Sequence, residues 1–290
     1  MTILSINKTR LELQDNSGIF CLKAKNTLFL LSKGDKKMRR LGIDLGSREV
    51  KVVLMEGKTI IEKFKVSTIK FYRDYCDFDG KIIVNFEKLN IKDIHSFVST
   101  GYGRNNIDLK LFKPINELKA HVYGAIYQTG LEDFILLDVG GQDVKVMKVE
   151  NGLITDLELN EKCAASCGRY LENMANVLEI SINELFTYYE DPIDLNSTCA
   201  VFSESELIGK IAEGIPIKRL CAGVNYSLYK RLLPLLSKFK GEKLLLSGGV
   251  AKNLALKKYL KNDYNEVQTL ENAQFNGALG CCYYSERMGL

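Results

Sequence analysis

Two cysteines, Cys163 and Cys199, stand in runs of small and polar residues ahead of segments with helical character. A reduced thiol is a soft ligand, suited to zinc or to the iron of an iron–sulfur cluster. Both cysteines lie between glycine-rich turns of the kind that holds nucleotide phosphates, at 138–143 and 247–250. Soft-metal ligands inside a phosphate-binding frame predict that nucleotide hydrolysis is coupled to electron transfer.

The number of ligands restricts what these thiols can hold. A cubane cluster and a structural zinc site each take four ligands, and Cys163 and Cys199 supply only two. Neither His95 nor His121 has metal-like spacing, and Cys167 forms a weak C-x3-C pair with Cys163. The plain alternative is that the three cysteines are small apolar residues at helix starts. A twofold dimer would supply four thiolates, two from each chain, at its axis.

Three glycine loops, at 44–47, 138–143 and 247–250, carry the second kind of chemistry. Glycine lets backbone N–H groups approach phosphate oxygens, and an acid at a strand end can hold Mg²⁺ through water. Each loop alone is also a common tight turn. The ordered set of three is more specific. A Gly-x-x-x-x-Gly-Lys-Ser/Thr run does not occur in the sequence, which excludes a P-loop.

Composition narrows the class of protein. The 290 residues are 46% hydrophobic with a net charge of +4, enough for a sizeable core in two lobes and unlike a nucleic-acid binder. A secretory signal and an apolar run that could span a bilayer are both lacking in the sequence, so we expect a cytoplasmic protein with reduced thiols and no membrane partner. The remaining cysteines are interpreted as core residues: Cys21, Cys76, Cys221, Cys281 and Cys282.

Hydrophobic periodicity predicts one strand pattern twice. Strands at 41–45, 49–55 and 59–66 follow the order strand, Asp-x-Gly, strand, turn, strand, and strands at 134–139, 145–150 and 153–159 repeat it. We therefore expect two related α/β lobes. Further elements are expected as a strand at 97–100, a strand at 243–246, and helices at 116–129, 168–178, 181–189, 203–213, 222–238 (kinked near Pro234) and 276–287.

These elements suggest a division of the chain. Residues 1–37 differ from the rest, with a weak hairpin around Asn16-Ser17-Gly18. Three readings stay open for them: a small flap, a poorly ordered extension, or a segment ahead of a true start at Met38. We expect lobe I at 38–131, lobe II with the cysteine segments at 132–273, and a C-terminal helix at 274–290 that packs back on lobe I.

The ordered loops resemble those of the actin, sugar-kinase and heat-shock-protein ATPase superfamily. The resemblance implies an α/β, actin-like ATPase fold with two ribonuclease-H-like lobes and ATP in the interlobe cleft. It implies that Asp44 acts through Mg²⁺ and that Asp138 or Gln142 positions the hydrolytic water, with the choice between Gln142 and Asp143 open. The implied nucleotide contacts are Gly46 and Ser47 in the first loop, Gly140 and Gly141 in the second, and Gly248, Gly249 and Val250 at the adenosine.

Five motifs resemble the activator of 2-hydroxyacyl-CoA dehydratases and the ATP-binding subunits of benzoyl-CoA reductase: 100–104, 139–145, 160–169, 198–206 and 274–280. The resemblance implies a homodimer with one [4Fe–4S] cluster, to which each subunit contributes Cys163 and Cys199. It further implies a ferredoxin or flavodoxin as electron donor. ATP hydrolysis would change the angle between the helices that flank the cluster, and a partner acyl-CoA dehydratase or reductase would receive a low-potential electron.

The sequence departs from the family pattern at Ser166-Cys167-Gly168, where Gly-Thr-Gly is usual, and at 67–80, where a glycine-rich loop is usual. We interpret the additional thiol, Cys167, as a packing residue. Two other functions stay open on the same fold. A small-molecule (sugar-type) kinase would need an acid such as Asp143 as base, and a nucleotide-gated assembly protein would not need the cysteines.

Overall fold

The computed structural model describes most of the chain. The described residues are 4–6, 9–13, 19–24, 27–32, 38–103, 113–160, 167–195, 200–239, 241 and 243–290, with the backbone alone up to residue 32. The chain divides into two compact units, Met1–Met38 and Arg39–Leu290, and each is described by itself.

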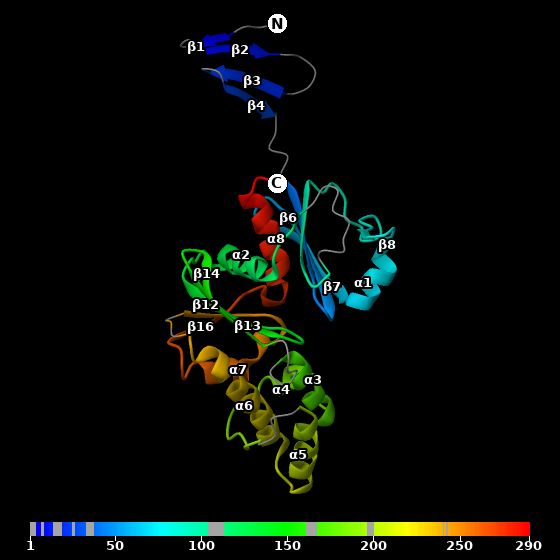
Figure 1. The fold of residues 1–290 in the computed structure, drawn as a ribbon, viewed down its shortest axis with the longest axis vertical. Helices are drawn as coiled ribbons and strands as arrows, with labels where there is room; N and C mark the ends of the chain where they lie inside the picture. Colours follow the sequence, from blue (N-terminus) through cyan, green and yellow to red (C-terminus); the bar gives the residue numbers. More distant parts are fainter. Residues whose placement is uncertain are drawn as a thin grey trace. The chain divides into compact units, whose positions relative to one another are not determined.

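The first unit contains a four-stranded antiparallel sheet in sequence order (Figure 1). Its strands are β1 (Leu4–Ile6), β2 (Thr9–Leu13), β3 (Ile19–Ala24) and β4 (Thr27–Ser32). Strands β2 and β3 pair antiparallel, which confirms the predicted hairpin, while its turn at 14–18 lies outside the described residues.

The second unit begins with a five-stranded sheet in the order β11-β10-β5-β6-β7. Strand β5 (Arg39–Leu45) pairs antiparallel with β6 (Glu49–Glu56), which pairs antiparallel with β7 (Thr59–Ser67). On its other side β5 lies parallel to β10 (Ser96–Gly101), and β11 (Lys113–Pro114) continues the parallel arrangement. The predicted strands of the first lobe are confirmed, each within about two residues of the expected bounds.

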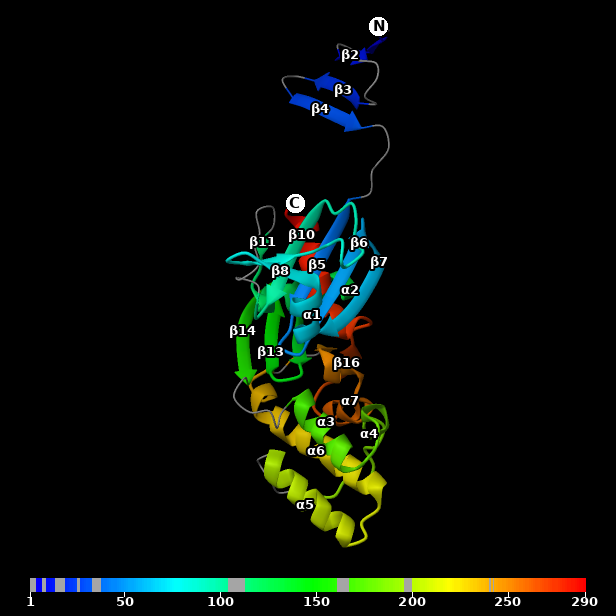
Figure 2. The ribbon, with the colours of Figure 1, turned by 90° about the vertical axis from the view of Figure 1, so that its right-hand side faces the viewer.

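A second five-stranded sheet has the order β14-β13-β12-β15-β16 (Figure 2). Its strands are β12 (Phe134–Val139), β13 (Val144–Glu150), β14 (Leu153–Asn160), β15 (Lys243–Ser247) and β16 (Glu266–Thr269). Counted along the chain, both sheets have the order 3-2-1-4-5 with the same strand directions. The prediction of two related α/β lobes is confirmed.

Two helices that cross closely connect the sheets. Helix α2 (Glu117–Thr129) begins after Asn116, whose side chain accepts from Leu118 N, and ends at Gly130 with φ 71°. Helix α8 (Asn276–Arg287) contacts α2, β5 and β10. A Cβ on Gly280 would lie 1.7 Å from Ala120 O, so only glycine permits this approach.

The other helices of the second unit form a layer on lobe II and the edge of lobe I. Helices α3 (Gly168–Val177), α5 (Ala200–Ala212) and α6 (Ile217–Leu236) confirm predicted helices, and α6 continues through Pro234 to end two residues later. The expected helix at 181–189 is wrong beyond its first turn. Only α4 (Ile182–Leu185) is helical; turn and irregular backbone follow it as far as Asp191, which precedes Pro192 and has φ 47°, outside the helical region.

Several elements were not predicted: α1 (Thr68–Tyr75), α7 (Leu254–Leu260) and the hairpin of β8 (Cys76–Phe78) with β9 (Ile82–Val84). The hairpin contains Asp79-Gly80, with Gly80 at φ 68°, which is a recognisable turn signal. Helix α1 and this hairpin occupy the segment 67–80 that departs from the family pattern.

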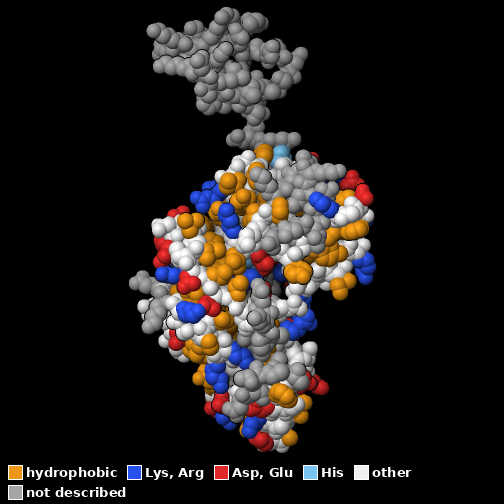
Figure 3. Space-filling view, viewed as in Figure 1, with side chains coloured by type: hydrophobic (Ala, Val, Ile, Leu, Met, Phe, Trp, Pro, Cys, Tyr) orange, Lys and Arg blue, Asp and Glu red, His pale blue; other side chains and the backbone are white. Residues whose placement is uncertain are grey.

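The surface of the second unit mixes both signs of charge on the face seen in Figure 3. Among the described residues, helices long and apolar enough to cross a membrane are absent. The buried thiols of Cys221, Cys281 and Cys282 confirm the interpretation of these cysteines as core residues, and Cys76 is half-buried. Cys21 has no described side chain.

Candidate nucleotide-binding site

A cleft of about 720 Å³ lies between the two sheets of the second unit. It collects every predicted nucleotide residue from three separate parts of the sequence. Cys163 and Cys199 lie outside the described residues. The predicted residues that line the cleft are Asp44, Gly46, Ser47, Asp138, Gly140, Gly141, Gln142, Gly248, Gly249 and Val250.

The first loop joins β5 to β6. A Cβ on Gly46 would lie 2.7 Å from Glu49 O, so the turn requires glycine. The Thr68 hydroxyl donates to Gly46 O at 2.7 Å and fixes the loop against the start of α1. Asp44 is buried one residue before the end of β5, directly opposite Lys51 on β6.

The second loop joins β12 to β13 in the same way. Gly140 N donates to Asp143 O at 3.0 Å, and a Cβ on Gly140 would lie 2.6 Å from Asp143 Oδ1. Gly168 N and Arg169 N, at the start of α3, donate to Gly140 O and Gly141 O, each at 2.9 Å. The second loop is therefore tied directly to the helix that follows the Cys163 segment.

The third loop follows β15. Gly248 has φ 86°, and a Cβ there would lie 2.3 Å from Val139 O, so the backbone conformation and the space both require glycine. Next to this loop, Val250, Ile182 and Phe186 form an apolar wall of the cleft. A flat aromatic base could lie against such a wall.

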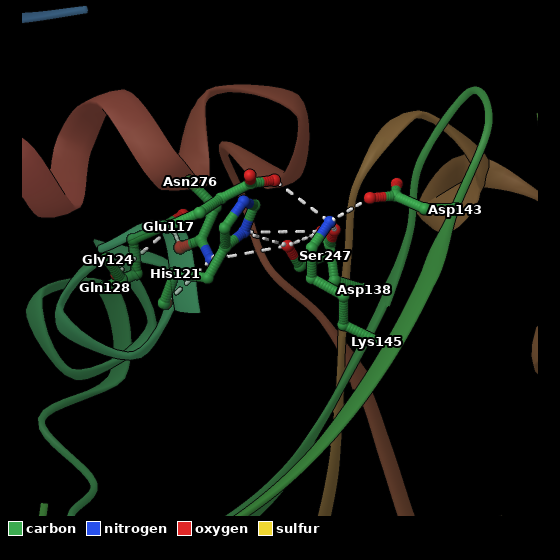
Figure 4. A network of polar contacts seen from close by, with 9 residues as sticks. All are labelled: Glu117, His121, Gly124, Gln128, Asp138, Asp143, Lys145, Ser247 and Asn276. Carbon is green, nitrogen blue, oxygen red and sulfur yellow. Dashed lines mark hydrogen bonds and ion pairs between the residues drawn. The ribbon is translucent and has the colours of Figure 1, made fainter. Parts of the chain in front are cut away.

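Lys145 is buried at the floor of the cleft, opposite Asp138 on β12 (Figure 4). Its Nζ lies 2.5 Å from Asp143 Oδ2, 2.9 Å from Glu117 Oε1 and 3.9 Å from Asp138 Oδ2. Lysines on strands are usually solvated, but Lys145 is buried and pairs with Glu117 on α2 and with Asp143.

His121 and Ser247 hold the other side of Asp138 (Figure 4). The Ser247 hydroxyl donates to Asp138 Oδ1 at 2.5 Å, and His121 Nδ1 lies 3.4 Å from the same oxygen. Asn276, the first residue of α8, donates from Nδ2 to His121 O at 2.9 Å and to Ser247 Oγ at 3.3 Å. Four different elements therefore fix the position of one carboxylate.

The two buried aspartates differ in their electrostatic surroundings. Burial raises the pKa of Asp44 above its ordinary value, and Lys51 and His121 offset part of the rise. Burial acts in the same direction on Asp138, but His121, Lys145 and the Ser247 hydroxyl outweigh it and hold the pKa of Asp138 below its ordinary value. Two carboxyls whose pKa values are pushed apart are suited to different roles in one reaction.

The charges at the floor of the cleft suit a divalent cation. Four carboxylates line the cleft there, those of Asp44, Glu117, Asp138 and Asp143, and Lys51 and Lys145 offset part of their charge. The described residues contain no cluster of three or more metal-ligating side chains. A Mg²⁺ ion would therefore be held through water and nucleotide phosphates, which is its usual preference.

The cleft is also bridged near α3. Arg48, beside Ser47 in the first loop, forms an ion pair with Glu172 on α3. Helix α3 contacts α5, and Asn173 Nδ2 donates to Glu204 Oε2 at 3.1 Å between them. Helix α5 begins at Ala200, immediately after Cys199 and three residues before the start expected from the sequence.

Three residues of the site were missed as functional candidates: Glu117, His121 and Asn276. A signal was present, because Glu117 and His121 are polar residues four apart on a helix face that otherwise carries apolar residues. Asn276, the partner of His121, is 155 residues from it in the sequence, and such pairings have no local pattern.

The repeated sheets and the cleft between them define a class of protein, the nucleotide-binding proteins with the actin-like ATPase fold. A solved structure of this fold is an activator of the 2-hydroxyisocaproyl-CoA dehydratase from Clostridium difficile with bound ADPNP. It matches with a TM-score of 0.75 at 30% identity, over 87% of this chain and 95% of that chain.

Within this class, the chain belongs to the BadF/BadG/BcrA/BcrD ATPase family, whose model matches residues 41–285. A relative, the (R)-2-hydroxyglutaryl-CoA dehydratase activating ATPase of Acidaminococcus fermentans, is 35% identical over 251 residues, 84% of this chain and 96% of the relative. The activator of lactoyl-CoA dehydratase of Anaerotignum propionicum is 35% identical over 260 residues, 86% of this chain and 97% of the relative. The family expected from the sequence motifs is confirmed.

Proposed function

We propose that this protein is an ATP-hydrolysing activator that transfers a low-potential electron from a [4Fe–4S] cluster to a partner acyl-CoA dehydratase or reductase. It acts as a homodimer in the cytoplasm, with a ferredoxin or flavodoxin as electron donor. The observation that carries the proposal is the hydrogen-bonded connection between the second glycine loop, Gly140-Gly141, and the start of α3 at Gly168-Arg169. The nucleotide loop is thereby bonded to the helix that follows the Cys163 segment in the sequence.

The cleft residues bind and cleave ATP in this proposal. The glycine loops at 46–47 and 140–141 present backbone N–H groups to the phosphates, and the third loop with Val250 contacts the adenosine. Asp44 holds Mg²⁺ through water. The carboxylate of Asp143 is already bonded to Lys145 Nζ at 2.5 Å, so we assign the orientation of the attacking water to Gln142 with Asp138.

Cys163 and Cys199 are the residues that would hold the cluster, two from each subunit of a twofold dimer. A [4Fe–4S] cluster supplies one-electron transfer at low potential when bound. The described neighbours of the two segments suit a shared ligand set, because α3 and α5 lie against each other. The thiol of Cys167 is fully buried in the core of lobe II, which supports its interpretation as a packing residue.

Coupling follows from the connections of α3. The first residues of α3 are fixed to the second loop, because Gly168 N and Arg169 N both donate hydrogen bonds to it. Its side chain Glu172 pairs with Arg48 of the first loop. Displacement of the second loop during ATP cleavage would therefore displace α3, and α5 with it, relative to lobe I.

Anaerobic purification and iron, sulfide and nucleotide analysis test the proposal. We expect about four iron atoms per dimer, bound ATP or ADP, and ATP-dependent reduction of an added acyl-CoA dehydratase. The C163S and C199S variants should lose the iron and the electron delivery while they retain nucleotide binding.

The half-buried Cys76 of lobe I offers a matched control, because C76S should retain all of the iron. A dimer that stays colourless after anaerobic reconstitution, or iron that survives in C163S and C199S together, contradicts the cluster assignment. ATP hydrolysis that requires an added sugar would instead favour a kinase on the same fold.

A further inference from the structure

His121 lies between the two buried aspartates of the cleft. On one side its Nδ1 is 3.4 Å from Asp138 Oδ1. On the other side, a Cβ built on Gly277 would lie 3.3 Å from His121 Nε2 and 3.0 Å from Asp44 Oδ2, so both groups border one small space. The side chain is 8% exposed, which leaves it little freedom to turn toward solvent.

The contact of His121 Nδ1 with Asp138 Oδ1 helps to determine the orientation of the Asp138 carboxylate. Ser247 and His121 both approach Oδ1, which leaves Oδ2 directed toward Lys145. An ionised carboxylate only accepts hydrogen bonds, so the contact is attractive in the forms of the imidazole that carry a hydrogen on Nδ1. The imidazole thus limits rotation of the carboxylate about its Cβ–Cγ bond.

His121 is held by α8. Asn276 Nδ2 donates to the backbone oxygen of His121 at 2.9 Å and lies 3.5 Å from Nδ1 of the ring. Gln128 Nε2 donates to Asn276 Oδ1 at 2.9 Å. Gln128 Oε1 in turn accepts from Asn272 N at 2.8 Å. Every polar atom of this support is satisfied by protein, which is the condition for a rigid buried network.

We propose that His121 is a positioning residue for ATP cleavage, which fixes the orientation of the Asp138 carboxylate and separates it from Asp44. The inference rests on the proposed function and deepens it. Glu117, Lys51 and Lys145 are the other charged groups near the ring, but none of them contacts Asp138 Oδ1. Without the ring, Ser247 alone would hold that oxygen.

Three substitutions distinguish the roles of the two ring nitrogens, Nδ1 and Nε2: H121A, H121N and H121Q. The asparagine amide reaches the position of Nδ1, whereas the glutamine amide reaches that of Nε2. We measure kcat and KM for ATP on the full-length protein purified anaerobically. H121A should lower kcat about 10- to 100-fold, the usual effect of removing the support of a catalytic group, with KM changed less than about threefold.

H121N should restore kcat to within about fivefold of the wild type, and H121Q should resemble H121A. His95 provides the matched control, since it lies outside the cleft and H95N should leave both constants unchanged. Thermal unfolding of each variant identifies any loss of folded protein. If H121A does not fold, the comparison of H121N with H121Q decides.

Equal kcat in H121A and the wild type overturns the inference, as does rescue by glutamine rather than asparagine. A change in KM alone also overturns it, because positioning of Asp138 acts on the chemical step. These outcomes leave the proposed function intact. A wild-type protein that does not hydrolyse ATP at all would contradict the proposed function itself.

Discussion

Arg48 and Glu172 form an ion pair across the nucleotide cleft, between the first glycine loop and helix α3. Arg48 also lies over the second loop, because its Cδ would be 3.8 Å from a Cβ on Gly141. One side chain therefore borders both phosphate loops and contacts the helix that follows the Cys163 segment. A nucleotide phosphate placed between the loops would compete with Glu172 for the guanidinium.

This competition predicts opposite effects of two substitutions. E172Q should tighten ADPNP binding about two- to fivefold, since a half-exposed ion pair of modest strength no longer competes. R48A should weaken it about tenfold or more, because a charge-assisted contact to phosphate is lost. Calorimetric titration measures both affinities. Weaker binding by E172Q would show that Glu172 supports Arg48 in the bound state and does not compete for it.

The two aspartates should respond in opposite ways to neutralisation. The raised pKa of Asp44 means that its contribution to stability is present below the unfolded pKa and lost as pH rises through the folded pKa. The lowered pKa of Asp138 means that its contribution is present above the unfolded pKa and lost as pH falls through the folded pKa. At neutral pH without Mg²⁺, D44N should raise Tm and D138N should lower it.

Both variants should lose ATP hydrolysis, so Tm and activity together separate electrostatic stability from catalysis. Differential scanning calorimetry in the presence of EDTA measures the two transitions. A fall in Tm for D44N would mean that Lys51 and His121 already compensate the buried charge fully. An unchanged Tm for D138N would mean that its contacts with Ser247 and Lys145 contribute nothing net.

Lys145 should be necessary for stability because it neutralises buried carboxylates. K145M leaves Glu117 and Asp138 without their cation, and breaking a buried pair in this way costs about 3–5 kcal/mol. Urea unfolding followed by circular dichroism measures the free energy of unfolding.

The control is K148M on the same strand, where an exposed lysine pairs with Glu150 at 2.7 Å. Such a pair contributes about 0–1 kcal/mol, so this variant should be nearly neutral. An equal loss of unfolding free energy in K145M and K148M would contradict the importance of Lys145 and its buried ion pairs.

The third glycine loop should not tolerate a methyl group. G248A forces φ away from 86° or drives Cβ into Val139 O, and we expect loss of nucleotide binding together with a lower Tm. G209A is the matched control, because nothing lies within 4 Å of a Cβ there and the residue is inside α5. It should stabilise the helix by about 0.5–1 kcal/mol. Normal ADPNP affinity in G248A would contradict the role of this loop.

Much of the fold could be predicted from local pattern. The apolar run Phe134–Val139 predicted a buried strand with its bounds unchanged in the structure, and the repeated Asp-x-Gly turns predicted the second lobe. The helix expected at 181–189 ends after Leu185, and Asp191, which precedes Pro192, has φ 47°, outside the helical region. The hairpin at 76–84 was missed although its Asp-Gly turn is a local signal.

The residues of the three glycine loops that line the cleft could be predicted because tight turns depend on glycine at fixed places, which is a property of the backbone. The supporting residues could not. Lys145 has the sequence pattern of an exposed strand residue, and only the packing of α2 against β13 buries it beside Glu117.

The sequence by itself determined the strand and helix periods, the three glycine turns and the family, since each is encoded over a few neighbouring residues. The tertiary structure alone decided which polar groups share the cleft floor. His121, Asn276 and Ser247 come from helices and a strand that are far apart along the chain, and they meet because the glycines of α2 and α8 allow those helices to cross closely. Packing over such separations has no local signature, so the electrostatics of Asp44 and Asp138 follow only from the folded chain.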